Sequence, residues 1–166
     1  MKLHLSLLQV DQVGQPYVDW FSNKEVIRYS ENQYRSLSLS AQRDYVRDCL
    51  SNKDIDLYGI FDCSLHIGNI AICDFNSLHR RAELTYVVGD PNYWGLGVAS
   101  FAISELVKLG KTKYQLNKLY AGVASGNIAS IKALEKNGFS REGIRKNHLI
   151  FSNAYHDQYD YGLILR

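Results

Sequence analysis

Two patterns of apolar and polar residues follow each other along the chain in a definite order. In seven segments these residues alternate, or form short apolar runs bounded by turn residues, and this pattern predicts β-strands. The predicted strands are residues 2–9, 55–61, 66–75, 82–89, 118–124, 143–151 and 155–165. Because short polar turns separate the second, third and fourth segments, we expect these strands to form an antiparallel meander.

Apolar residues at helical spacing predict helices between the strands. The predicted helices are residues 14–23, residues 40–52, a segment that begins after Gly97, and residues 127–138. Pro16 stands near the first turn of the first helix, and Ser40 is the expected N-cap of the second. Asn127 is the expected N-cap of the fourth helix, and Gly138 its C-terminal stop. The polar, Tyr-rich residues 24–40 predict a loop with room for a broken helix.

The order of these elements, β-α-α-β-β-β-α-β-α-β-β, is typical of an α+β fold. The length of 166 residues suits one domain with a sizeable core, and no repeat or linker divides the chain. We therefore expect a single domain, residues 1–166. Its sheet should be mixed and mostly antiparallel, with about seven strands and with helices on both faces.

Composition and charge exclude several classes of protein. Apolar residues make up 46% of the chain, charged residues 22%, and the net charge is +2 without a long run of like charge. The cluster at 79–81 is read as a solvated turn, so we expect no nucleic-acid partner. The first ten residues resemble neither a signal peptide nor a membrane span, which favours a cytoplasmic protein.

The cysteines and histidines show no spacing that is typical of a metal site. The cysteines are an odd number without a C-x-x-C pair, and we interpret them as small buried apolar residues in a reducing compartment. They are Cys49, Cys63 and Cys73. The histidines His4, His66, His79, His148 and His156 include no pair at ligand spacing. We therefore predict no metal ion, and direct transfer is favoured over a covalent cysteine intermediate for any group-transfer chemistry.

A glycine-containing turn, N-Y-W-G-L-G at residues 92–97, stands directly before the third predicted helix. The N-terminus of a helix presents unpaired N–H groups and the positive end of its dipole, and both favour an anion. Gly95 and Gly97 would let backbone approach a phosphate without a side chain between them. A dinucleotide fingerprint is excluded because Ser100 takes the place of its third glycine. The alternative is a strand-to-helix turn that needs glycine only for its backbone conformation.

The surrounding sequence resembles the GNAT superfamily of acyl-CoA N-acyltransferases. A strand ending in T-Y-V-V-G-D-P, the glycine turn with its helix, a further strand and then N-x-x-S…E-K-N-G-F follow in one order. The family's turn reads Q/R-x-x-G-x-G/A, and this chain departs from it with Asn92 in the first position. The resemblance covers nearly the whole chain and is most specific over 82–139. It implies acetyl-CoA as the acyl donor, its pyrophosphate at the turn, and a splay between the fourth and fifth strands.

The resemblance also implies which residues bind acetyl-CoA. In the family, the acyl-pantetheine arm pairs with the free edge of the strand before the turn. The expected binding residues are Tyr86, Val87, Val88, Asn92, Tyr93, Trp94, Gly95, Leu96, Gly97, Val98, Ala99, Ser100, Asn127, Ser130 and Lys136. Asn127 is equally compatible with a simple helix cap, and Lys136 with an ordinary exposed lysine.

Two residues are candidates for catalysis. Glu83 lies on the strand expected to line the acyl site, among apolar and aromatic residues that raise the pKa of a carboxyl group toward that of a useful base. Its structural alternative is an ion pair with Arg80 or Arg81. Many relatives have a tyrosine that acts as a general acid at the position that Leu134 occupies in this chain. Ser130 instead matches a serine that protonates the departing thiolate in a related branch of the family. The structural alternative for Ser130 is a hydrogen bond back to the helix backbone.

The acceptor is expected to meet two groups of residues. One lies between the first two helices, Tyr29, Glu31, Asn32, Tyr34 and Arg35, and the other near the C-terminus, Tyr155, His156 and Asp157. The resemblance implies either a protein α-amine, which is slightly favoured, or a nucleotide-linked amino sugar. For the sugar, the basic candidates are Arg28, Arg35, Arg145 and Lys146. A catalytically silent acyl-CoA-binding module is a third hypothesis. A monomer or homodimer is expected.

Overall fold

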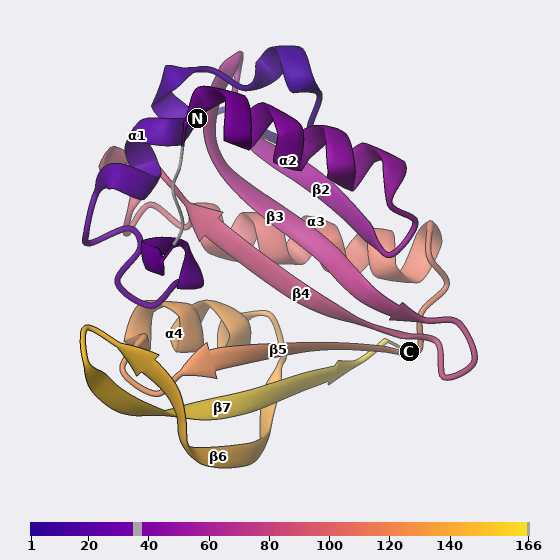
Figure 1. Ribbon diagram of the computed structural model, residues 1–166. Coiled ribbons are helices and arrows are strands. Elements are labelled where there is room, and N and C mark those ends of the chain that lie inside the picture. Colours follow the sequence, from indigo (N-terminus) through magenta and orange to yellow (C-terminus); the bar gives the residue numbers. More distant parts are fainter. Residues whose placement is uncertain (35–37, 166) are drawn as a thin grey trace.

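A seven-stranded sheet with the order β1-β2-β3-β4-β5-β7-β6 forms the centre of the computed structural model, which describes residues 1–34 and 38–165. The strands are β1 (Leu3–Leu7), β2 (Ile55–Asp62), β3 (Leu65–Asn76), β4 (Arg81–Val88), β5 (Lys118–Ala124), β6 (Ser140–Phe151) and β7 (Ala154–Ile164). The helices are α1 (Gln15–Ser22), α2 (Leu39–Ser51), α3 (Val98–Thr112) and α4 (Ile128–Lys136), with the 3-10 turns η1 (Val10–Gln12), η2 (Glu31–Tyr34) and η3 (Pro91–Tyr93). The predicted α+β fold is confirmed (Figure 1).

The pair β4–β5 is parallel, whereas the other neighbouring strands run antiparallel. β4 and β5 pair only at their beginnings, where Glu83 lies opposite Tyr120. Beyond Glu83 the two strands diverge, and Figure 1 shows α4 beside the opening between them. The predicted splay of the fourth and fifth strands is thus present.

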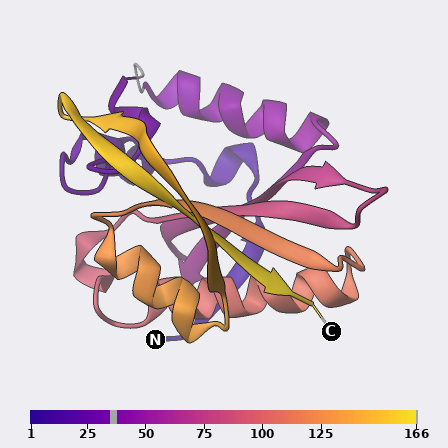
Figure 2. The ribbon, with the colours of Figure 1, turned by 90° about the horizontal axis from the view of Figure 1, so that it is seen from below.

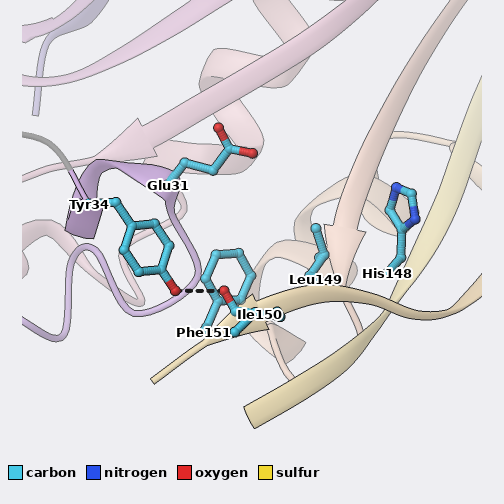
Figure 3. Close-up of a pocket in the computed structure, with 6 residues that line it drawn as sticks. All are labelled: Glu31, Tyr34, His148, Leu149, Ile150 and Phe151. Carbon is cyan, nitrogen blue, oxygen red and sulfur yellow. Dashed lines mark hydrogen bonds between the residues drawn. The ribbon is translucent and has the colours of Figure 1, made fainter. Parts of the chain in front are cut away.

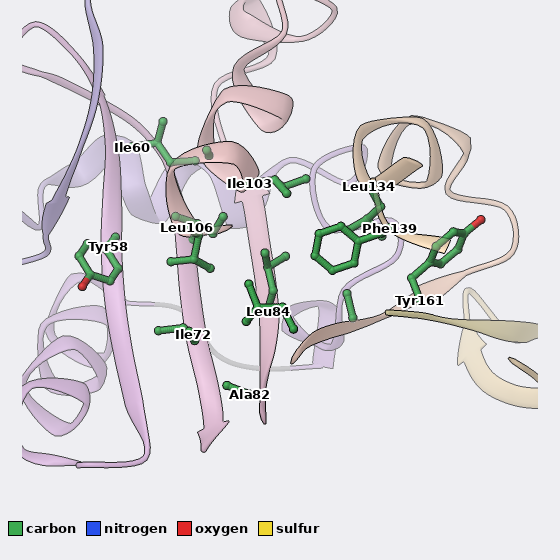
Figure 4. Packing of buried hydrophobic residues seen from close by; sticks show 14 of the residues in the cluster. Tyr58, Ile60, Ile72, Ala82, Leu84, Ile103, Leu106, Leu134, Phe139 and Tyr161 are labelled. Atoms are coloured by element: carbon green, nitrogen blue, oxygen red, sulfur yellow. The ribbon is translucent and has the colours of Figure 1, made fainter. Parts of the chain in front are cut away.

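Alternating side chains of the strands separate two apolar clusters on opposite faces of the sheet. Figure 2 shows α2 on one side and α3 with α4 on the other. On the α3 side, Ile72, Leu84 and Ile103 are almost wholly buried and pack in one cluster (Figure 4). On the α2 side, Trp20 and Phe61 belong to the second cluster. Burying one such side chain contributes about 1.5–3 kcal/mol, so the alternation within each strand fixes which face meets which helices.

Two details differ from the sequence-based expectations. The N-cap of α2 is Ser38, whose hydroxyl accepts a 3.1 Å hydrogen bond from the Ala41 N–H, so the prediction of Ser40 was wrong. Serine is a preferred N-cap residue at either position. The helix already includes Leu39, so Ser38 is the residue that directly precedes it. Cys63 is exposed in the turn between β2 and β3, so it is not a buried apolar residue as predicted. The amino-acid composition gives no information on the position of Cys63 in a tight turn.

Other local expectations are confirmed. The Oδ1 atom of Asn127 accepts a 3.2 Å hydrogen bond from the N–H of Ser130, as an N-cap does. Gly138 follows α4 with a φ of 85°, in the left-handed region that ends helices. The segment after α1 is a loop that contains the short turn η2. Within the ranges that the structure describes, no helix is both long and apolar enough to cross a membrane.

Candidate active site

The glycine turn before α3 provides an open approach to the helix N-terminus. Gly95 and Gly97 have φ values of 74° and 82°, a left-handed conformation that side chains rarely adopt. Apart from the glycine and its chain neighbours, none of the described residues has an atom within 4 Å of a Cβ placed on either glycine, so they leave the space in front of both open. Gly97 is the N-cap of α3, and the first N–H groups of the helix follow it at Val98, Ala99 and Ser100. This arrangement fits a phosphate or pyrophosphate group.

Hydrogen bonds on its N-terminal side hold this turn against β4. The Nε1 atom of Trp94 donates to the carbonyl oxygen of Val88, at the end of β4, over 2.8 Å. Asp90 caps η3, since its Oδ1 atom accepts from the backbone N–H of Asn92 at 2.9 Å and from the side-chain amide of Asn92 at 3.0 Å. The end of β4 and the start of the turn are therefore one connected unit.

The other predicted cofactor residues lie around the same turn. The Tyr93 hydroxyl donates to Asp62 over 3.1 Å, which joins the turn to the β1–β2 end of the sheet. Leu96 is exposed at the tip. The side-chain amide of Asn137, just after α4, donates to the Ser100 hydroxyl over 3.1 Å, so the first turn of α3 is tied to the end of α4. Lys136 is exposed on the last turn of α4.

The C-terminal half of β4 has one paired edge and one open edge. Tyr86, Val87 and Val88 pair with β3 on one side and lie beyond the last β4–β5 pair on the other. The three residues are partly buried. Beyond Glu83 this second edge has no strand partner among the described residues, an arrangement suited to an extended ligand that pairs as in β-strand addition.

A hydrogen bond across the splay joins β4 to α4. The hydroxyl groups of Tyr86 and Ser130 lie 2.6 Å apart. Burial raises the pKa of the Tyr86 phenol, so the O–H group is retained at neutral pH. The sequence indicated Tyr86 only as part of the strand edge, and its phenol was missed because the pairing spans 44 residues. The bond of the Ser130 hydroxyl to Tyr86 also differs from the helix back-bonding that was its structural alternative.

Glu83 occupies the base of the splay, at the last β4–β5 pair. Its side chain is about half-buried, and burial raises the pKa of its carboxyl group, with the Asp74 carboxylate as the next cause. Neither Arg80 nor Arg81 forms an ion pair with Glu83 among the described residues, and Arg80 donates instead to the backbone oxygen of Gln115. Both effects move the pKa of Glu83 in the direction that a candidate general base requires.

The two predicted acceptor segments meet at Tyr29. Its ring lies edge-on to His156 and to Phe151, with centroid separations of 5.9 Å and 6.2 Å. A Cβ atom on Gly126 would lie 2.7 Å from the Tyr29 hydroxyl, which places that hydroxyl directly beside the turn that begins α4. The Arg28 guanidinium stands 5.3 Å from the centre of the same ring. The segment after α1 therefore connects the β6–β7 hairpin with the β5–α4 turn.

An open groove of about 420 Å³ runs between η2 and the β6–β7 hairpin (Figure 3). It is lined by Glu31, Tyr34, His148, Leu149, Ile150 and Phe151. The Tyr34 hydroxyl donates to the backbone oxygen of Ile150 over 2.8 Å, which holds η2 against β6. Residues 148–151 belong to the C-terminal strands expected to influence acceptor choice, but none of them was among the individual acceptor-binding residues predicted.

The remaining predicted acceptor residues have varied surroundings. Tyr155 is 68% exposed on the hairpin. Asp157 forms a 2.8 Å ion pair with Lys146, and this cation lowers the pKa of the Asp157 carboxyl group. The backbone N–H of Asn32 donates to the hydroxyl of Ser30. Arg35 lies outside the described residues.

Comparisons with curated proteins agree with these features. A family model described as an acetyltransferase (GNAT) domain matches residues 2–140. The chain is 30% identical over 158 residues to the uncharacterized N-acetyltransferase YoaA of Bacillus subtilis, covering 93% of this chain and 89% of that protein. It is 33% identical over 88 residues to a spermidine N(1)-acetyltransferase of Escherichia coli, covering 53% of this chain and 47% of the relative. In that second alignment the chain spans about half of the relative's length.

Solved structures share the fold at lower sequence identity. A spermidine N-acetyltransferase from Vibrio cholerae, in complex with CoA and spermine, superposes with a TM-score of 0.86 at 20% identity over 99% of this chain and 96% of that one. A ribosomal α-N-protein acetyltransferase in complex with coenzyme A has a TM-score of 0.88 at 18% identity over 99% and 95% of the two chains. Both coenzyme A complexes have the fold described above.

Proposed function

Since this chain belongs to the GNAT family of acetyl-CoA-dependent N-acetyltransferases, we propose that it transfers acetyl directly to a primary amine, with Glu83 as the base. The α-amino group of a protein or peptide is the favoured acceptor. The observation that carries the proposal is the splay of β4 from β5, because Glu83 lies at its base and the glycine turn of α3 at the other end of β4.

Acetyl-CoA supplies an activated acetyl group, and the residues at the splay fit it. The N–H groups that follow Gly97 are suited to the pyrophosphate, and the open edge of Tyr86–Val88 to the pantetheine arm. A backbone N–H near Val87 or Val88 is suited to stabilise negative charge on the carbonyl oxygen of the acetyl group.

Two residues of the proposed site, Glu83 and Ser130, transfer protons. Glu83 accepts the proton that a primary amine must lose before it attacks, directly or through a water molecule. On the other side of β4, the Ser130 hydroxyl protonates the departing thiolate and regains its proton from solvent. The Tyr86 hydroxyl, 2.6 Å away, holds the Ser130 hydroxyl in place. A raised pKa at Tyr86 keeps this second hydroxyl neutral through the cycle.

The charges around the splay favour a cationic acceptor over an anionic one. Asp74 raises the pKa of Glu83 through its negative charge, so an ammonium group gains from its field. Of the basic candidates for a nucleotide, Arg145 is bound to Asp160 and Lys146 to Asp157, each at 2.8 Å. A nucleotide-linked amino sugar would have to compete with these pairs, which supports the α-amine.

The first experiment separates binding from turnover. Thermal melts with acetyl-CoA and with CoA should show a rise of several degrees, because a ligand that binds only the folded state stabilises it. Thiol release is then followed with an Ala-initiated peptide, spermidine, and a UDP-linked amino sugar as acceptors. The peptide should give the highest kcat/KM. A rate with the UDP sugar alone would overturn the peptide assignment, and no shift with either CoA species would overturn the site.

The Glu83→Gln variant tests the base and excludes a silent binding module. We expect kcat to fall about 10²–10⁴-fold while the Kd for CoA stays unchanged. Glu105→Gln is the matched control, because Glu105 pairs with Lys108 on the surface of α3 and should leave both quantities unchanged. Full activity in Glu83→Gln would remove Glu83 from the mechanism.

A further inference from the structure

A cross-strand row of residues surrounds Glu83. Cys73 on β3 and Tyr120 on β5 are its direct register partners on either side. Asp74 follows Cys73 at a point where the β3–β4 register shifts, and it has a φ of 50°, in the left-handed region. Irregularities of this kind redirect a side chain and are over-represented beside active sites.

The redirected Asp74 carboxylate accepts a short hydrogen bond from the Tyr120 hydroxyl. β3 and β5 are not neighbours in the sheet, because β4 lies between them. The bond therefore passes over β4 at the level of Glu83. The bond places the Asp74 carboxylate beside the carboxyl group at the base of the splay.

We propose that Asp74 and Tyr120 are positioning residues that hold a second carboxylate beside Glu83. This inference rests on the proposed function, in which Glu83 is the base. Asp74 supplies the neighbouring negative charge, and Tyr120 keeps that charge in place through a neutral donor. Like charges at close range disfavour ionisation of a second carboxyl group, which makes Glu83 a stronger base.

The other groups that face Glu83 contribute less of this effect. They are Cys73 from β3, Arg145 from β6 and Asp160 from β7. Burial raises the pKa of the Cys73 thiol to about 12, so it stays uncharged. Asp160 is paired with Arg145 at 2.8 Å, and the two charges largely cancel at Glu83. The partner of Asp74, in contrast, is a phenol whose own pKa is raised by burial and by Asp74.

A carboxyl titration tests the inference without any acceptor. In protein labelled with ¹³C at glutamate carboxyl carbons, the Glu83 signal is assigned by its disappearance in Glu83→Gln. Asp74→Asn should lower the pKa of Glu83 by about 0.5–1 unit, and Tyr120→Phe should lower it by a smaller amount, because the charge is kept but no longer held in place. In the Asp74→Asn background, Tyr120→Phe should cause no further change, because the charge it holds is gone.

A second Asp–Tyr hydrogen bond in the same protein gives a matched control. The Tyr114 hydroxyl donates to Asp56, which also pairs with Lys113 at 2.9 Å. Asp56→Asn should lower the melting temperature and leave the titration of Glu83 unchanged.

Two results separate this inference from the proposed function. An unchanged Glu83 pKa in Asp74→Asn would overturn the positioning pair and leave Glu83 as the base. A shifted pKa, together with full turnover in Glu83→Gln, would overturn the base and leave the electrostatic coupling in place. If both hold, the acid limb of the kcat/KM profile should move down in Asp74→Asn by the same amount as the Glu83 titration.

Discussion

The two edges of β4 have opposite structural roles. Toward β3, pairing reaches from Arg81 at one end of the strand to Val88 at the other, with one register shift between Glu83 and Arg81. Toward β5, pairing ends at Glu83. The edge toward β3 is paired at both of its ends, whereas the edge toward β5 has no strand partner beyond Glu83 among the described residues. The proposed reaction site therefore needs no separate cleft, because an interrupted ladder supplies both the opening and the polar groups beside it.

The largest effect is expected on folding stability, from a substitution in β3 on the paired side of β4. Ile72→Ala removes a fully buried side chain from β3 and should lower the free energy of unfolding by about 2–5 kcal/mol in a denaturant titration. Ile164→Ala is the matched control, because Ile164 is 45% exposed on β7 and should cost about 1 kcal/mol at most. Equal losses in the two variants would mean that packing beneath β3 is loose.

The next effect concerns the glycine turn at the open side. Gly97→Ala forces a side chain into the left-handed region and places its Cβ in the space expected to hold the pyrophosphate. We expect the Kd for CoA in calorimetry to rise about 10-fold, with a loss of about 1–2 kcal/mol in folding stability. Gly143→Ala, where the added Cβ meets only ordinary contacts, should change neither. Unchanged affinity in Gly97→Ala would place the phosphates elsewhere.

A smaller effect is expected from the bond that crosses the open side. Tyr86→Phe removes the hydroxyl that holds Ser130 and should lower kcat about 10-fold without changing the Kd for CoA. Tyr161→Phe serves as the control, because it removes another buried tyrosine's hydrogen bond, to Glu135, away from the splay. If both variants lose stability and neither loses kcat, the Tyr86–Ser130 bond is structural.

The smallest effect is a change of stability with pH. The pKa of Glu83 is raised in the folded state, so folding takes up a proton between the unfolded and the folded pKa values. Stability from this group is therefore greatest below the unfolded pKa and is lost as the pH rises through the folded one. At pH 7, Glu83→Gln should raise the melting temperature by about 1–2 °C, a modest amount because the carboxyl is half exposed. No such gain should appear at pH 4.

Local patterns along the chain were enough to predict much of this arrangement. The alternation of strand residues gave the meander, and the cap at Asn127 and the turn at Gly95 and Gly97 follow from short-range backbone rules. Contacts between distant side chains were not accessible in this way. The Tyr86–Ser130 bond depends on how α4 sits against β4, and the Tyr120–Asp74 bond on a register shift that leaves no local signal.

The acceptor region shows the same limit. Glu31 and Tyr34, two of the predicted acceptor residues, line the groove at η2. The other wall consists of residues 148–151, whose alternation predicts only a strand. The contact of Tyr29 with His156 joins two predicted segments, although nothing in either segment specifies the partner. Sequence order identified the regions, and tertiary packing determined which side chains meet.

The indole of Trp94 gives this protein a built-in optical probe. The chain contains two tryptophans, of which Trp20 is 6% exposed in the core and Trp94 is 43% exposed at the tip of the glycine turn. A water-soluble quencher such as acrylamide therefore reaches mainly Trp94. Because the Trp94 ring is bonded to the last carbonyl of β4, its emission and its protection from quenching should report directly when a ligand occupies the turn.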